Sequence, residues 1–144
     1  MLGGEFRHAL DAKGRVSVPF RFRNEMGDVV VVSKGIGEKC LYIFPMSEWK
    51  KIEDKISGLP ISDARAREVT RFFAGGSSEI EIDKQGRIML PQYLRDYACL
   101  GKDVVIIGAV NRAEIWDTAV WEAQLGSNGE YYANIEEDMK ELGI

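Results

Sequence analysis

The sequence predicts an α+β fold, mainly β with helices, built from two tandem copies of one unit. The first observation is an internal repeat: Asp, Gly, Arg, Pro and Arg recur in the same order in LDAKGRVSVPFRFR and IDKQGRIMLPQYLR, each 72 residues after its counterpart. The second is an alternation of apolar and polar residues around both turns, which is typical of strands with one buried face. The third is a helical spacing of apolar residues after each copy.

The composition is that of a folded, soluble chain. With 144 residues, 45% of them hydrophobic, it can form one compact domain with a substantial core. Acidic residues exceed basic ones by 23 to 19, which disfavours indiscriminate polyanion binding but not a local basic patch. Cys40 and Cys99 lack metal-ligand spacing, and no apolar stretch reaches the roughly 20 residues of a membrane helix. We therefore expect a cytoplasmic protein with no leader, membrane segment or metal.

Each copy is expected to begin with a strand, a turn and a second strand. The residues that alternate toward one face in the two copies are Phe6, His8, Leu10, Val16 and Val18, then Ile80, Ile82, Ile88 and Leu90. Two continuous apolar runs follow, 29–32 and 104–107, and these predict core strands buried on both faces. Asp28 and Asp103, next to these runs, look like equivalent positions of the two copies.

Short and longer helices are expected after these strands. Pro19 and Pro91 suit the first position of a short helix, because the proline ring fixes φ near its helical value. Ser47 is expected to cap a longer helix that ends at Gly58, and Asp117 to cap its equivalent in the second copy.

The segment between the copies and the one after them also have a helical pattern. Ser62 opens a stretch with an apolar stripe at Val69, Phe72 and Phe73, and a final amphipathic piece covers about 131–142. The organisation we predict is a first repeat over 1–57, a helical connector over 58–77, a second repeat over 78–125 and an acidic helical tail over 126–144.

Charge is distributed unevenly along the chain. The first 23 residues carry five Lys or Arg against two acidic side chains, whereas 126–144 carry five acidic side chains against one lysine. The tail therefore has two interpretations: a solvated surface, or a segment that covers the basic turns in the free protein.

The repeated D-x-x-G-R turn has a clear physical logic. The Asp side chain can accept turn N–H groups, the Gly can adopt a positive φ, and the Arg then lies at the shoulder of the hairpin. In one interpretation Asp11 with Arg15, and Asp83 with Arg87, form ion pairs that only hold the turns. In the other, the aspartates shape the turns while the arginines project into a nucleic-acid groove. The sequence favours the first interpretation for the aspartates and the second for the arginines.

These residues resemble a known family. The paired LDAKGRVSVP and IDKQGRIMLP segments, with TRFFAGGSSE before the second copy and AEIWD after it, are similar to the MraZ family of bacterial transcriptional regulators, which is related to AbrB-type DNA-binding proteins. The resemblance covers essentially residues 1–125. It implies two swapped-hairpin units related by internal pseudo-symmetry, a ring-like homo-oligomer, and binding to direct repeats in DNA upstream of a cell-division and cell-wall gene cluster.

The resemblance also implies which residues contact DNA. The two DxxxR loops would form the contact face, and the basic residue shifts within the turn from Lys13 in the first to Lys84 in the second. The expected DNA-binding residues are Arg15, Arg87, Lys13, Lys84 and Arg7, and the expected loop-shaping residues are Asp11, Gly14, Asp83 and Gly86. The partners would be double-stranded DNA and further copies of the chain on the nucleoid, with no cofactor and no small-molecule substrate. The alternative is a structural ring without direct DNA binding.

Other motifs have weaker functional support. His8, the only histidine, is expected to be a packed strand residue, and Glu79, Glu81 and Asp83 are expected to be solvated rather than a metal site. No nucleophile, base and orienting group can be assembled into a catalytic constellation, so an enzyme is not predicted. For Arg21, Arg23 and Arg95, contact with phosphate and pairing with carboxylates stay equally open.

Overall fold

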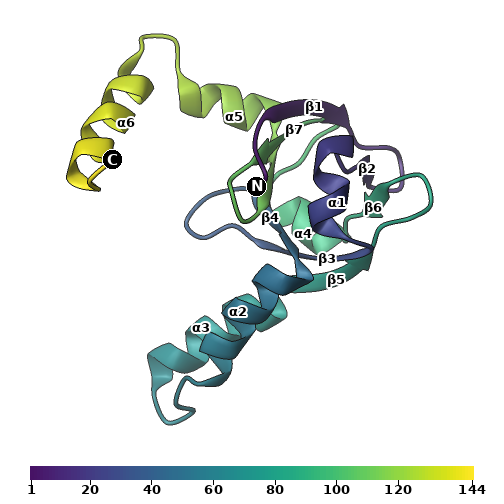
Figure 1. Ribbon diagram of the computed structural model, residues 1–144, viewed down its shortest axis with the longest axis vertical. Coiled ribbons are helices and arrows are strands. Elements are labelled where there is room, and N and C mark those ends of the chain that lie inside the picture. Colours follow the sequence, from purple (N-terminus) through teal and green to yellow (C-terminus); the bar gives the residue numbers. More distant parts are fainter.

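The computed structural model describes residues 1–144, and its centre is a six-stranded antiparallel sheet with strand order β1-β7-β8-β4-β3-β5 (Figure 1). The strands of this sheet are β1 (Glu5–Ala9), β3 (Val29–Lys34), β4 (Leu41–Pro45), β5 (Ser77–Glu81), β7 (Asp103–Gly108) and β8 (Ala113–Asp117). A second sheet has only two strands, β2 (Arg15–Ser17) and β6 (Arg87–Met89). The two repeats, together with the helices described below, form the α+β fold that the sequence predicts.

The two repeats exchange strands. β1 belongs to the first repeat but pairs with β7 of the second, while β5 of the second pairs with β3 of the first. The small ribbon likewise takes β2 from one repeat and β6 from the other. Neither repeat therefore completes its own sheet.

Apolar side chains on the two faces of the large sheet form two cores. Val30 and Val32 belong to the larger core of 18 buried residues, which also contains the inward side chains of the β2–β6 ribbon. Val31 points to the opposite face, where it joins a smaller core of six buried residues around Trp49 and Trp116. The prediction that runs 29–32 and 104–107 form strands with both faces buried is confirmed.

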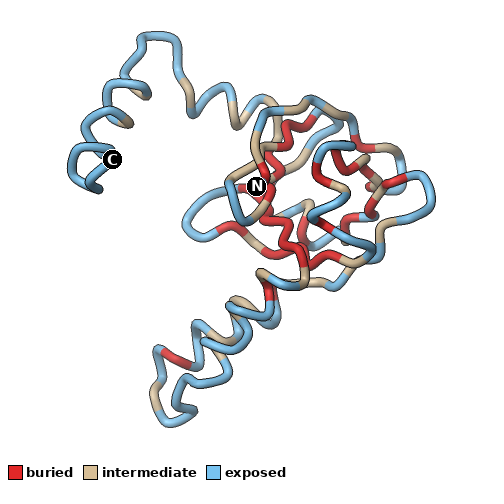
Figure 2. Tube along the Cα trace, in the orientation of Figure 1, coloured by how far each residue is buried: buried red, intermediate tan, exposed pale blue.

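The short helices cover the face of the large sheet that carries the larger core, and the longer helices extend from the body. The helices are the 3-10 turn η1 (Phe20–Phe22), α1 (Arg23–Met26), α2 (Met46–Ser57), α3 (Ala64–Gly75), α4 (Gln92–Tyr97), α5 (Thr118–Leu125) and α6 (Glu130–Glu141). The α2–α3 pair projects from one side of the body, and α5 leads α6 away from another (Figure 1). Both projections consist largely of exposed residues (Figure 2).

Helix starts differ from the prediction at two of three caps. Asp117 caps α5 as expected, accepting a hydrogen bond from the Val120 N–H. Ser47, however, is the second residue of α2, which follows Pro45 and has no side-chain cap. The cap of α3 is Asp63 rather than Ser62, and its carboxylate accepts from two N–H groups of the first turn. A carboxylate is the better cap here because it also complements the helix dipole.

The strand registers correct one equivalence between the repeats. The Leu10 N–H bonds to the carbonyl of Lys102, and at the same place in the other repeat the Ile82 N–H bonds to the carbonyl of Asp28. Asp28 therefore corresponds to Lys102, not to Asp103, because the loops before β3 and β7 differ in length.

Both cysteines are free, and no helix has the length and apolar character needed to cross a bilayer.

Candidate nucleic-acid interface

The first D-x-x-G-R turn joins β1 to β2 and is held together by one carboxylate. Asp11 Oδ1 accepts from the backbone N–H groups of Lys13 and Arg15, at 2.9 and 2.8 Å. Its other oxygen, Oδ2, accepts from Arg15 Nε at 2.6 Å. Gly14 closes the turn at φ +81°, a conformation that disfavours any residue with a Cβ. The turn is thus a rigid unit that fixes the direction of one arginine.

The second turn repeats this geometry bond for bond. Asp83 Oδ1 accepts from the N–H groups of Gln85 and Arg87, both at 2.9 Å, and Oδ2 accepts from Arg87 Nε at 3.1 Å. Gly86 has φ +77°. In both turns the aspartate holds the turn as the first interpretation expects, and each arginine is anchored through Nε while its two Nη groups make no hydrogen bond within the chain.

The β2–β6 ribbon places the two arginines on one surface. In its register Val16 lies opposite Ile88 and both are buried, so the flanking residues point outward. Arg15 and Arg87 occupy diagonal positions of that outer face, which are about 7–8 Å apart in antiparallel ribbons. Their side chains are 31% and 29% exposed. The outer face also carries Ser17 and the exposed Met89, and we call these four side chains the ribbon face.

Each turn is covered by an arginine from the other repeat. A Cβ built on Gly14 would lie 2.6 Å from Cζ of Arg95, and one built on Gly86 would lie 2.2 Å from Cζ of Arg23. Arg95 Nε donates to the Leu90 carbonyl and Arg23 Nε to the Val18 carbonyl. Neither arginine pairs with a carboxylate, so the interpretation of Arg23 and Arg95 as ion-pair partners of acidic residues is wrong. They pack on the turn glycines because strand exchange brings each repeat's helix start to the other's turn.

Replacing Gly86 by alanine tests this packing. The substitution should lower the free energy of unfolding by about 1–3 kcal/mol through the positive φ alone, and by a further amount because Arg23 must move. Gly37→Ala is the matched control, since Gly37 has φ +68° and open space around it. Urea unfolding of both variants should show the larger loss for Gly86→Ala. Equal losses would mean that Arg23 does not restrain the turn.

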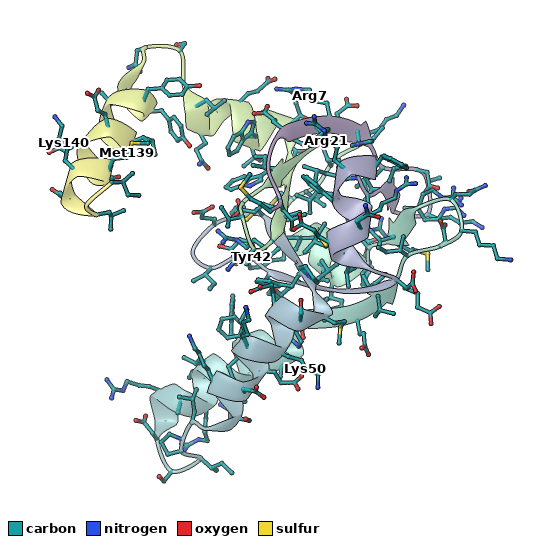
Figure 3. The ribbon with its side chains drawn as sticks, in the orientation of Figure 1. Arg7, Arg21, Tyr42, Lys50, Met139 and Lys140 are labelled. Carbon is teal, nitrogen blue, oxygen red and sulfur yellow. The ribbon has the colours of Figure 1, made fainter.

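The remaining predicted basic residues fall into two groups. Lys13 and Lys84 are exposed within the turns, adjacent to the ribbon face. Arg7 lies elsewhere: its neighbour Phe6 packs on the larger core, so Arg7 points to the other face of the sheet, where it pairs with Glu5 and with Glu122 of α5. Figure 3 shows Arg7 and Arg21 near β1 rather than at the turns. The structure therefore does not bring Arg7 to the ribbon face.

Comparison with known proteins decides the family. The family model described as "MraZ protein, putative antitoxin-like" matches residues 1–72 and again 73–142. The chain belongs to the MraZ family. It is 49% identical to the transcriptional regulator MraZ of Natranaerobius thermophilus and 47% identical to that of Halothermothrix orenii, in both cases over 144 residues that cover all of each chain. The MraZ family comprises transcriptional regulators rather than enzymes, in agreement with the lack of a catalytic constellation in the sequence.

The two MraZ repeats differ in the charge beside their turns. A hollow of about 500 Å³ next to the first turn is lined by Asp11, Arg95 and Lys102, among others. At the position that corresponds to Lys102, the second turn has Asp28. A basic residue, Lys102, therefore lines the hollow beside the first turn, whereas the corresponding residue of the first repeat, Asp28, is acidic. Sequence reasoning missed Lys102, because the repeat offset of 72 does not hold through the loops and hides the correspondence.

The turn carboxylates are strongly stabilised in their ionised form. The hydrogen bond from the Arg15 N–H, with those from the Arg15 side chain and the Lys13 N–H, lowers the pKa of Asp11 to about 2 despite partial burial. The equivalent N–H of Arg87 is the main cause that lowers the pKa of Asp83. Both arginines thus keep their anchors at any pH near neutrality.

These pKa values predict a pH dependence of stability. Because Asp11 has a folded pKa below its ordinary value of 3.8, its contribution is complete above pH 3.8 and is lost as pH falls toward about 2. We expect Asp11→Asn to be less stable than the wild type near neutral pH, and the difference to shrink across that acidic interval. Urea midpoints measured from pH 7 to pH 2 check this. A difference that stays constant down to pH 2 would contradict the carboxylate's role.

A cluster of possible metal-binding side chains and the acidic tail both lie away from the ribbon face. Glu38, Cys40 and Glu114 converge within 4.8 Å, but Glu114 already accepts from Arg112 and Trp116, and burial raises the pKa of the Cys40 thiol. Cys40 is a buried member of the smaller core and Glu114 is hydrogen-bonded beside it, whereas Glu38 is exposed. The acidic helix α6 is on the opposite side of the molecule from both turns (Figure 1), so it does not cover them within one chain.

Proposed function

We propose that this MraZ family member is a transcriptional regulator that binds double-stranded DNA through its two D-x-x-G-R turns. The observation that carries the proposal is the ribbon face, on which two guanidinium groups are anchored by carboxylates and keep their Nη donors free. A two-stranded ribbon fits the major groove, where an arginine can donate two hydrogen bonds to guanine O6 and N7. The exposed Met89 on the same face offers an apolar contact to a thymine methyl group.

The function also requires several copies of the chain. One subunit offers a small basic patch at its turns, with Arg15, Lys13, Arg87 and Lys84 on or beside the ribbon face, on a chain whose net charge is −4. Binding to a single element would therefore be weak at physiological salt. A homo-oligomeric ring that engages successive direct repeats would gain affinity through effective concentration. We place these repeats upstream of a cell-division and cell-wall gene cluster, and the protein on the nucleoid in the cytoplasm.

The test is a titration of labelled DNA with one, two or three direct repeats from that promoter region. Affinity should rise with each repeat, and its logarithm should fall linearly with the logarithm of salt concentration, by about 0.9 for each phosphate neutralised. Shuffled DNA of equal length and composition is the control. Equal affinity for shuffled DNA would refute sequence-specific binding. A native mass that shows assembly, together with no binding at all, would favour the alternative of a structural ring.

A further inference from the structure

Helix α6 has an apolar face that nothing in the chain covers. Ile135, Met139 and Leu142 recur at helical spacing on one side, while the acidic residues and Lys140 occupy the rest. Figure 3 shows Met139 and Lys140 on opposite sides of the helix. No residue of α6 is buried, and only α5 makes more than a marginal contact with it. A helix of 12 residues is marginally stable in water by itself, so this face requires a partner.

The two repeats differ at this point. In each repeat a longer helix follows the last sheet strand, α2 after β4 and α5 after β8, and a second helix comes next. α3 folds back along α2, whereas α6 points away from α5 (Figure 1). Side chains of α2 and α3 line a common groove, whereas no helix packs along the length of α6.

A matching apolar groove lies between α2 and α3. It has a volume of about 420 Å³, and six of its ten lining residues are hydrophobic. Trp49 and Phe73 form its inner part, while Leu59 and the 85% exposed Ile61 form its open end. Exposed side chains of this size rarely gather in a monomer without a function in binding.

The charges beside the two surfaces are complementary. A smaller hollow shares Leu59 and Ile61 with the groove and is lined by Arg67 and Arg71 of α3. The helix α3 carries three arginines and one glutamate, whereas α6 carries five acidic residues and one lysine. Arg71 pairs only with the exposed Glu68, at 3.5 Å, and such surface pairs exchange partners at little cost. Glu53, at the groove wall, is the one lining residue with the opposite charge.

From these observations we infer that α6 of one copy binds the α2–α3 groove of the next copy, with Ile135, Met139 and Leu142 in the groove and its acidic residues facing Arg67 and Arg71. This inference rests on the proposed homo-oligomer and names its interface. The contact joins two different surfaces, so a bound pair still presents one free groove and one free α6 to further copies. Such head-to-tail contacts close into rings when the rotation per copy allows it. The turns, on the far side from both surfaces, stay accessible to DNA (Figure 1).

Disulfide trapping between two variants tests the contact directly. One chain carries Ile135→Cys and the other Ile61→Cys, both with Cys99→Ser so that the buried Cys40 is the only native thiol left. Mixed under oxidising conditions, they should form a covalent dimer between chains. Lys140→Cys replaces Ile135→Cys as the control and should give none, because it lies on the opposite side of α6. If Ile135→Cys gives no more of the mixed covalent dimer than Lys140→Cys does, the inference is overturned.

Native mass measurements add an independent test. Ile135→Asp with Met139→Asp removes the apolar face of α6, and Arg67→Glu with Arg71→Glu reverses the charge beside the groove. Each double variant should be monomeric and folded, since these positions are not buried. Mixing the two should restore dimers, because one intact pair of surfaces remains. If both variants still form the wild-type assembly, the inference fails and the proposed ring stands. A wild-type chain that stays monomeric overturns both, and DNA titration separately decides the binding function.

Discussion

Replacing Arg15 by alanine is expected to reduce the affinity for repeat DNA by about 5- to 150-fold for each engaged subunit, which is the worth of one bidentate contact to guanine. The loss should be large because Asp11 has already fixed the guanidinium, so little side-chain freedom is lost on binding. Fluorescence anisotropy with DNA of fixed repeat number measures it. Arg15→Lys should retain the salt dependence but lose preference for the repeat sequence, since lysine lacks the planar fork.

The same substitution in the second turn should have a smaller effect. Arg87 has equivalent anchors, but Asp28 stands where the first turn has Lys102, so the field beside it attracts phosphate less. Arg87→Ala should therefore weaken binding in the same direction and to a lesser degree. Lys39→Ala, which removes an exposed charge far from the turns in sequence, is the control and should leave affinity unchanged. Equal losses of DNA affinity for Arg15→Ala, Arg87→Ala and Lys39→Ala would mean that the substitutions act only through the net charge of the chain.

The strands and turns could be predicted because their causes are local. Alternation in the segments around Val16 and Ile88 reports which side chains point inward, whatever strand they pair with. The D-x-x-G-R pattern likewise determines its own turn through bonds that span only four residues. Helix starts were predicted less well: Ser47 is a good cap by residue type, but Pro45 takes the cap position two residues earlier and α2 begins at Met46.

The local sequence pattern could not predict which elements pair with which, since the pairing depends on strand exchange between the repeats. The repeat offset shows that Arg23 and Arg95 are equivalent, yet nothing local says that each packs on the glycine of the other repeat's turn. The position of Arg7 is a similar case. Its place in a basic stretch suggested DNA contact, whereas the pleat of β1 turns it to the face occupied by Glu122. A run of basic residues in the sequence therefore identifies a basic surface only once the pairing of the strands is known.

Strand exchange leads to the second large effect, a loss of stability that both repeats share. Ile88 is fully buried opposite Val16 in the ribbon, within the core that contains side chains of both repeats. Ile88→Ala should lower the free energy of unfolding by about 2–5 kcal/mol, from lost burial and the cavity left behind. Unfolding should stay a single transition, because neither repeat completes a sheet alone. Met89→Ala, the exposed neighbour on the same strand, should change stability by no more than about 0.5 kcal/mol.

Tryptophan fluorescence can report on the two repeats separately. Trp49 belongs to the first repeat, and Trp116 and Trp121 belong to the second. In variants that keep only one set, with phenylalanine at the other positions, adding Ile88→Ala should lower the urea midpoint of each by the same amount. Because Ile88 belongs to the second repeat in sequence, a shift confined to Trp116 and Trp121 would mean that the repeats fold as separate domains. An equal shift would mean that the two repeats unfold together because they exchange strands. The same exchanged strands fix the two turns relative to each other on the ribbon face.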